Sequence, residues 1–93
     1  MRRDVFQALA DPTRRQIISM LAKQPMHLNA IAENFTISRP AISKHIKMLS
    51  ECGLIKISKQ GRERNCTADL NQLAEVAGFI KQLGTIWNQK LDA

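Results

Sequence analysis

The chain has 93 residues, which is the size of a single domain. Its composition is 44% hydrophobic, yet no run approaches the roughly 20 consecutive apolar residues of a membrane span. Two arginines near the start have no apolar stretch behind them, which argues against a secretory signal. Two cysteines make no disulfide framework and fit a reduced compartment. We therefore expect one globular domain over residues 1–93 that works in the cytoplasm, without a membrane partner.

The positive charge is concentrated in the middle third of the chain. Fourteen basic and eight acidic residues give a net charge of +6, of which +5 falls within residues 35–68. An excess of this sign favours a polyanionic partner, either nucleic acid or an anionic membrane surface. The central position of the charge indicates a defined basic surface rather than an even solubilising coat.

Two helices are predicted before Pro25. The first, at about 4–10, starts with Asp4-x-x-Gln7, a pattern that resembles a capping box. The second starts at Asp11-Pro12, because Asp is a good N-cap and Pro suits the first helical position. Its apolar face is predicted at Ile17, Ile18, Leu21 and Ala22.

Two further helices are predicted before Gly53, which ends the second of them. A short third helix follows from the spacing of Leu28, Ile31 and Ala32 and closes around residues 34–35. Ser38 can cap the fourth helix. The inward positions of the fourth helix are predicted at Ile42, His45, Ile46 and Leu49.

The pattern changes after Gly53. β-forming residues follow, and Gln60-Gly61 is a turn signal, so residues 54–68 are predicted to form a β-hairpin. A last helix, capped by Asp69 or Asn71, is expected over about 71–91. The predicted fold is mainly α with a minor β component: four helices, a hairpin and one long helix.

Only about four residues, 35–38, separate the predicted third and fourth helices. A turn this short forces a steep crossing, as in the helix-turn-helix, whose second helix can lie in the DNA major groove. The outward face of the fourth helix then carries Arg39, Ser43, Lys44 and Lys47, which can donate to guanine edges or phosphates. Taken alone, this face is explained equally well as an ordinary solvated surface.

The predicted hairpin adds a second basic feature beside that helix. Its turn region holds Lys59, Arg62 and Arg64 with few apolar groups to bury it. A basic hairpin next to a recognition helix can reach the sugar–phosphate backbone, which predicts a winged helix-turn-helix. The alternative is a solvated hairpin tip. Arg14 and Arg15 could contact phosphate or form surface salt bridges.

Three segments carry a resemblance to a known family: 10–18 (ADPTRRQII), 38–49 (SRPAISKHIKML) and 53–55 (GLI). In this order they resemble the ArsR family of bacterial winged-helix repressors, and within it the short autorepressor-like branch named after a sporulation delay repressor. The resemblance covers nearly the whole chain and implies a homodimeric transcriptional repressor that binds an inverted-repeat DNA operator. It implies DNA contacts at Thr36, Ser38, Arg39, Ser43, Lys44, Lys47, Arg62 and Arg64.

Metal-sensing relatives carry Cys-x-Cys in the third helix or Asp and His pairs in the last helix. This chain has no cysteine in residues 28–34 and no histidine after His45, so we expect no metal and no cofactor.

Cys52 and Cys66 are expected to be buried small hydrophobes, with a redox pair as the alternative. His27 is expected at a helix start, and His45 packed inside. No nucleophile–base signature is present, so an enzyme is not expected.

The last helix carries a seam with gaps of three, four, three and four residues, as in a coiled coil. A second apolar strip, Phe79 and Ile86, lies beside it. Since a chain of this size is marginal as a monomer, we expect this helix to pair with its copy, beside the first helix as the resemblance implies; the alternative is a helix covered by its own domain. The predicted interface, in helices 4–10 and 71–91, consists of Val5, Leu9, Leu73, Val76, Ile80, Leu83 and Trp87.

Three hypotheses follow. The first is a homodimeric, sequence-specific DNA-binding repressor. The second is a winged-helix protein-interaction module whose basic face binds an acidic protein. The third is a thiol-responsive form of the first, which depends on Cys52 and Cys66. The sequence does not identify the operator or an inducer.

Overall fold

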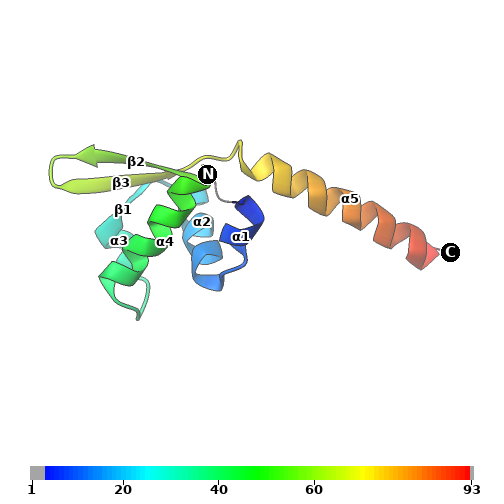
Figure 1. Ribbon diagram of the computed structural model, residues 1–93, viewed down its shortest axis with the longest axis horizontal. Helices are drawn as coiled ribbons and strands as arrows, with labels where there is room; N and C mark the ends of the chain where they lie inside the picture. The colour runs from blue at the N-terminus through cyan, green and yellow to red at the C-terminus, as the bar shows by residue number, and fades with distance from the viewer. Residues whose placement is uncertain (1–3, 93) are drawn as a thin grey trace.

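The computed structural model describes residues 4–92. The element order is α1 (Val5–Leu9), α2 (Pro12–Lys23), β1 (Met26–His27), α3 (Leu28–Ala32), α4 (Arg39–Glu51), β2 (Ile55–Gln60), β3 (Glu63–Ala68) and α5 (Leu73–Asp92). Figure 1 shows the first four helices gathered in one body, with the β2–β3 hairpin and α5 extending from it in opposite directions. The mainly helical fold with a small β component is confirmed.

Three predicted N-caps are formed. The side chains of Asp4, Asp11 and Ser38 accept hydrogen bonds from the backbone N–H groups two or three residues ahead, at 3.1, 3.0 and 3.3 Å. Each bond satisfies a donor that the first helical turn leaves unpaired. The φ of Gly53 is +78°, the left-handed conformation that ends α4. His27 is the N-cap residue of α3 and makes no side-chain cap bond.

Replacing Asp11 with alanine should lower the free energy of unfolding by about 1 kcal/mol at neutral pH, because the N-cap of α2 is lost. The bond from the Arg14 backbone N–H holds the pKa of Asp11 below its ordinary value, although burial opposes this. A lowered pKa makes the stabilisation full above the ordinary carboxyl range and removes it as the pH falls through the folded value. Urea denaturation at neutral and acid pH measures this. Equal midpoints for Asp11→Ala and the wild type at neutral pH would contradict it.

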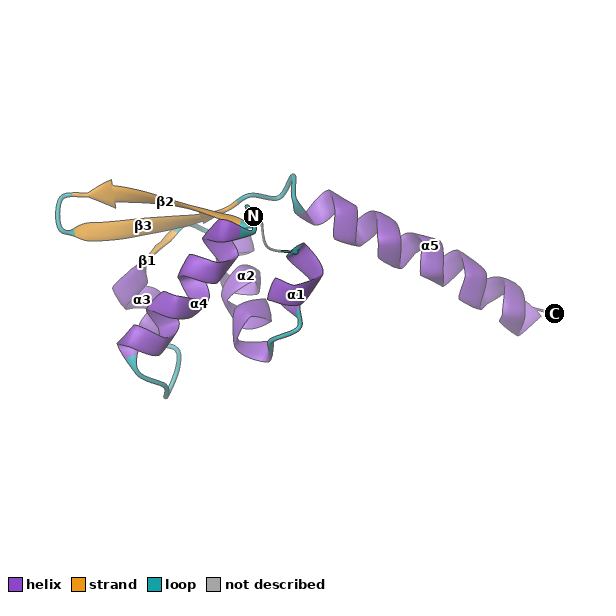
Figure 2. Ribbon diagram, in the orientation of Figure 1, coloured by secondary structure: helices purple, strands orange, loops and turns teal. Residues whose placement is uncertain are grey.

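The sheet contains one strand more than predicted. The hairpin expected over 54–68 is formed by β2 and β3, with Ile55 opposite Ala68 and Gln60 opposite Glu63. The short β1 adds to the other edge of β3, so the strand order is β1-β3-β2 (Figure 2). Gly61, at φ +65°, takes the first position of the two-residue turn, where only glycine has this freedom at no steric cost.

The boundaries differ slightly from those predicted. The turn between α3 and α4 spans 33–38 rather than 35–38, and α5 begins at Leu73 rather than at 71. Asp69 still acts here: its side chain accepts from the backbone N–H of Asn71 at 3.2 Å, in the loop before the helix. Helix ends are the least determined part of a pattern read from spacing alone.

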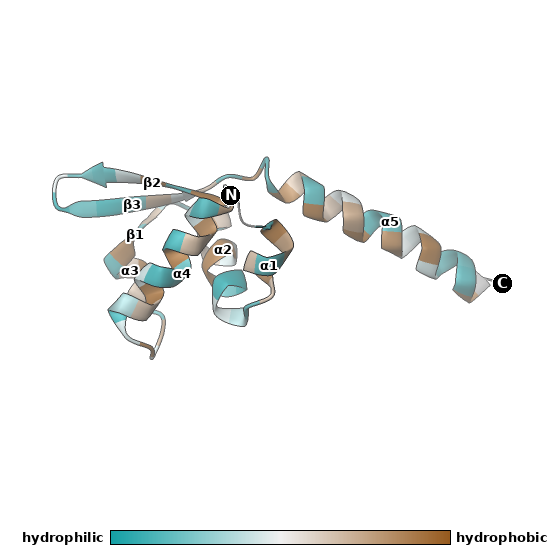
Figure 3. Ribbon diagram, viewed as in Figure 1, coloured by the Kyte–Doolittle hydropathy of each residue, from teal (hydrophilic) through white to brown (hydrophobic). Residues whose placement is uncertain are grey.

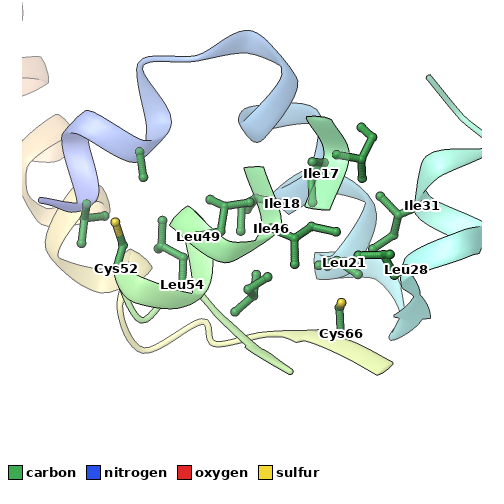
Figure 4. Close-up of a cluster of buried hydrophobic side chains, with 14 residues drawn as sticks. Ile17, Ile18, Leu21, Leu28, Ile31, Ile46, Leu49, Cys52, Leu54 and Cys66 are labelled. Atoms are coloured by element: carbon green, nitrogen blue, oxygen red, sulfur yellow. The ribbon is translucent and has the colours of Figure 1, made fainter. Parts of the chain in front are cut away.

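One apolar core joins α1–α4 to the base of the hairpin (Figure 4). The predicted inward residues of α2 and α4 are buried except Ala22, which is exposed, and His45, which is half-buried. Cys52 and Cys66 are both buried in the core, as expected for small hydrophobes. The largest fully buried side chains are Ile17, Ile31, Ile42, Ile46, Leu49, Leu54, Cys52 and Cys66.

Only the start of α5 packs on this core. Leu73 and Val76 are partly buried against it, and the rings of Phe6 and Phe79 meet edge to face with centroids 5.3 Å apart. Farther along, Ile80 and Trp87 are 61% and 63% exposed, and apolar residues recur along the projecting helix (Figure 3). The alternative of a helix covered by its own domain is therefore wrong for most of α5.

Candidate nucleic-acid interface

The outward face of α4 is basic, as the spacing predicts. Ile42, Ile46 and Leu49 are buried, which turns the other side of the helix toward solvent. Arg39, Lys44 and Lys47 are exposed there, and Ser43 is half-buried. Thr36 and Ser38 lie in the turn before α4, where the Ser38 Oγ already accepts the N-cap bond.

The hairpin forms a basic wing beside α4. Lys59 on β2 lies directly opposite Arg64 on β3, and Arg62 is in the turn. Like charges placed opposite each other destabilise a sheet, so this pair favours a function that requires positive charge at the wing. Lys59 is outside the set of DNA contacts that the resemblance implies. Its position one residue before the Gln60-Gly61 turn places it across from Arg64, which is in that set.

A groove of about 360 Å³ lies between the start of α4 and the wing. We call it the wing groove. It brings together Arg39 and Ser43 of α4 with Arg62 and Arg64 of the wing, residues that lie far apart in sequence. No ion pair or hydrogen bond engages the three guanidinium groups within residues 4–92. The remaining lining residues are His27, Leu28, Asn29, Pro40 and Glu63.

A second hollow, of about 400 Å³, lies on the other flank of α4 against α2. Lys44 and Lys47 line it together with Arg14 of α2. The predicted contacts on α4 therefore divide into two groups, with Arg39 and Ser43 toward the wing and the two lysines toward α2. Thr36 and Ser38 line neither hollow.

The paired arginines of α2 have an internal role that the sequence did not reveal. Arg14 donates from Nε to the carbonyl of Ala8 at 2.7 Å, and Arg15 donates from Nη1 to the carbonyl of Leu9 at 2.9 Å. These carbonyls belong to the last turn of α1, where no intrahelical partner exists. The Nη1 of Arg14 also lies 3.3 Å from Nδ1 of His45, the half-buried histidine of α4. The two arginines thus tie α1 to α2.

The predicted interface residues fall into two groups. Val5 is 6% exposed and belongs to the core of its own protomer, so its assignment to the interface is corrected. Leu9, Leu73 and Val76 are partly buried against the same core. The remainder of the predicted seam is exposed on α5: Ile80, Leu83 and Trp87.

The cysteines and acidic groups form no further chemical site within residues 4–92. Burial raises the pKa of Cys66, which disfavours the reactive thiolate, and neither Cys52 nor Cys66 is in a disulfide. Over the same residues, no three His, Cys, Asp or Glu side chains lie close enough to hold a metal ion. In this part of the chain no helix is both long and apolar enough to cross a bilayer.

A basic second helix after a tight turn, with a basic hairpin beside it, defines a winged helix-turn-helix protein. The family model for the "Bacterial regulatory protein, arsR family" matches residues 11–56. The crystal structure of an ArsR family transcriptional regulator superposes with a TM-score of 0.81 at 32% identity, over 95% of this chain and 97% of that one. The chain belongs to the ArsR family and is a DNA-binding transcriptional regulator.

Two other proteins are similar to this chain. The transcriptional repressor SdpR of Bacillus subtilis (strain 168) is 41% identical over 59 residues, which cover 63% of this chain and 66% of the repressor. The chain thus spans just under two thirds of that relative. A homodimeric winged helix-turn-helix DNA-binding domain from Mycobacterium bovis, solved in solution, shares the fold with a TM-score of 0.70 at 22% identity, over 87% of this chain and 75% of that one.

Proposed function

We propose that this chain is a homodimeric repressor that binds an inverted-repeat operator through α4 and the wing. The observation that carries the proposal is the wing groove, where α4 and the wing present to one space three guanidinium groups that have no partner within residues 4–92. Arginine donors suit both guanine edges in the major groove and backbone phosphates. The similarity to SdpR, which is named a transcriptional repressor, supports the repressor role. We propose a cytoplasmic regulator, not an enzyme.

The exposed face of α5 supports the homodimer. Phe79, Ile80, Leu83, Ile86 and Trp87 recur along this face and are all exposed in the protomer. Apolar surface of this extent on one helix marks an interface. A second copy of the same helix covers it with an equally apolar face, as a two-fold interface requires. The shared fold of the homodimeric domain from Mycobacterium bovis is in keeping with this assembly.

Fluorescence anisotropy with DNA from immediately upstream of the gene tests the proposal. We expect tighter binding to this DNA than to a scrambled duplex of the same composition. The logarithm of the binding constant should fall with the logarithm of salt concentration, with a slope of about −0.9 for each phosphate neutralised. Failure to bind either duplex at low salt would contradict DNA binding by the basic surface. An acidic protein would then be the better partner, as in the second hypothesis.

A further inference from the structure

The wing groove contains one carboxylate among its arginines. Glu63 stands between Arg62 and Arg64 in the sequence and lines the same groove as Arg39. Its side chain is 56% exposed, so a molecule that enters the groove meets it directly. A carboxylate repels the phosphates that the surrounding cations attract. Its presence here is therefore opposed to the function proposed for the groove.

The carboxylate of Glu63 is held by a histidine and not by the arginines around it. Its Oε2 lies 3.3 Å from Nε2 of His27, and among the residues that the structure describes no ion pair joins it to an arginine. The cause lies in the sheet. His27 of β1 pairs with Asn65 of β3, and Glu63 is two residues from Asn65, so both side chains project from the same face of the strand. The pairing of β1 thus brings His27 to the side of β3 from which Glu63 projects.

The two ring nitrogens of His27 have different surroundings, and its backbone is placed by the sheet. Its Nδ1 is buried and has no hydrogen-bond partner within residues 4–92, while Nε2 reaches the carboxylate. Its backbone is placed by the pairing of β1 with β3 and by the start of α3. Because no side-chain cap bond depends on His27, its side chain can be altered without loss of the helix cap.

We propose that Glu63, held by His27, is an electrostatic brake on DNA binding that lowers the phosphate affinity of the wing. This inference depends on the proposed DNA-binding function. The carboxylate offsets one of the cations of each wing, while the arginines have no ion-pair partner in the described part of the chain and stay available. A repressor with this brake releases DNA more readily than its arginine content alone would allow.

The test is Glu63→Gln, which removes the charge and keeps the shape of the side chain. We expect binding to tighten about threefold for each wing, hence about tenfold for a dimer, the size of effect typical of exposed charge pairs. The slope of the logarithm of the binding constant against the logarithm of salt concentration should become more negative by up to about one for each wing. Anisotropy at two salt concentrations, with the upstream and scrambled duplexes, measures both. Because a misfolded variant would lose affinity, a gain in affinity cannot be caused by misfolding.

Two further variants separate the brake from a general charge effect. Glu75→Gln makes the same change of charge at an exposed position in the first turn of α5, away from the groove, and should leave affinity nearly unchanged. In the background of His27→Ala, where the carboxylate is no longer held, Glu63→Gln should tighten binding clearly less than it does in the wild type. An equal gain in both backgrounds would overturn the role of His27.

The outcomes also distinguish this inference from the proposed function. If the wild type binds the upstream DNA and Glu63→Gln binds it equally or more weakly, the brake is overturned while the repressor stands. If Glu63→Gln binds the upstream duplex more weakly than the wild type does but binds the scrambled duplex equally well, Glu63 is a base contact. A carboxylate can accept a hydrogen bond from the cytosine amino group. If the wild type binds no DNA at low salt, both proposals fail.

Discussion

Replacing Leu83 with glutamate is expected to convert the dimer into a folded monomer and to abolish operator binding. Leu83 is 48% exposed in the protomer and is not part of its core, so the substitution leaves the body of the protein intact. In a two-fold dimer the same change appears twice and places unpaired charges in an apolar interface, at a cost of about 3–5 kcal/mol for a fully buried charge. The corresponding loss in dimer affinity is at least about 100-fold.

Sedimentation velocity measures the assembly, and circular dichroism shows whether the fold is retained. Thr85→Glu is the matched control because it adds the same charge to the same helix, two residues away and on the opposite side. We expect it to sediment as a dimer. A Leu83→Glu variant that still sediments as a dimer would move the interface away from this face of α5.

Arg39→Ala is expected to weaken operator binding by about 1–3 kcal/mol for each protomer, or about fivefold to 150-fold, with the dimer unchanged. The reason is its place at the start of α4, exposed and lining the wing groove without a partner within residues 4–92. Lys44→Ala, on the other flank of α4, is expected to act in the same direction.

The salt dependence separates their roles. A residue that contacts phosphate should lower the slope by about one when it is removed, whereas a residue that reads a base should relax specificity and leave the slope unchanged. Lys81→Ala removes a basic residue from α5, outside both hollows, and serves as the charge-matched control. Normal operator binding by either α4 variant would remove that residue from the DNA-binding surface.

Local signals in the sequence predicted most of the helical fold. Caps at Asp4, Asp11 and Ser38 and the glycine at 53 act through bonds and φ values within a few residues, so their effect is visible in the sequence itself. The strand β1 was missed for the opposite reason. Two residues are too few for an alternating pattern, and they are extended only because β3 offers them an edge.

The site was predicted as a set of residues and not as an arrangement. Spacing on α4 identified its outward basic face, because a helical period fixes which side is buried. The wing groove combines residues from β1, α3, α4 and β3, so its shape depends on tertiary packing. The proximity of His27 to Glu63 follows from the register of a strand that was not expected. The assignment of Val5 to the interface is wrong because an apolar stripe on a helix shows only that the stripe is buried. It does not show whether its own domain or a partner covers it.

The short pairing of β1 with β3 also affects the entropy of DNA binding. It ties the base of the wing to the residue that starts α3, so the hairpin and the helix-turn-helix share one rigid attachment at residues 65–66. Ordering a backbone costs about 1–2 kcal/mol per residue. Because the wing is already anchored there, only the hairpin beyond Asn65 still has conformational freedom to lose on contact with DNA. The base of the wing thus needs little further ordering when DNA binds.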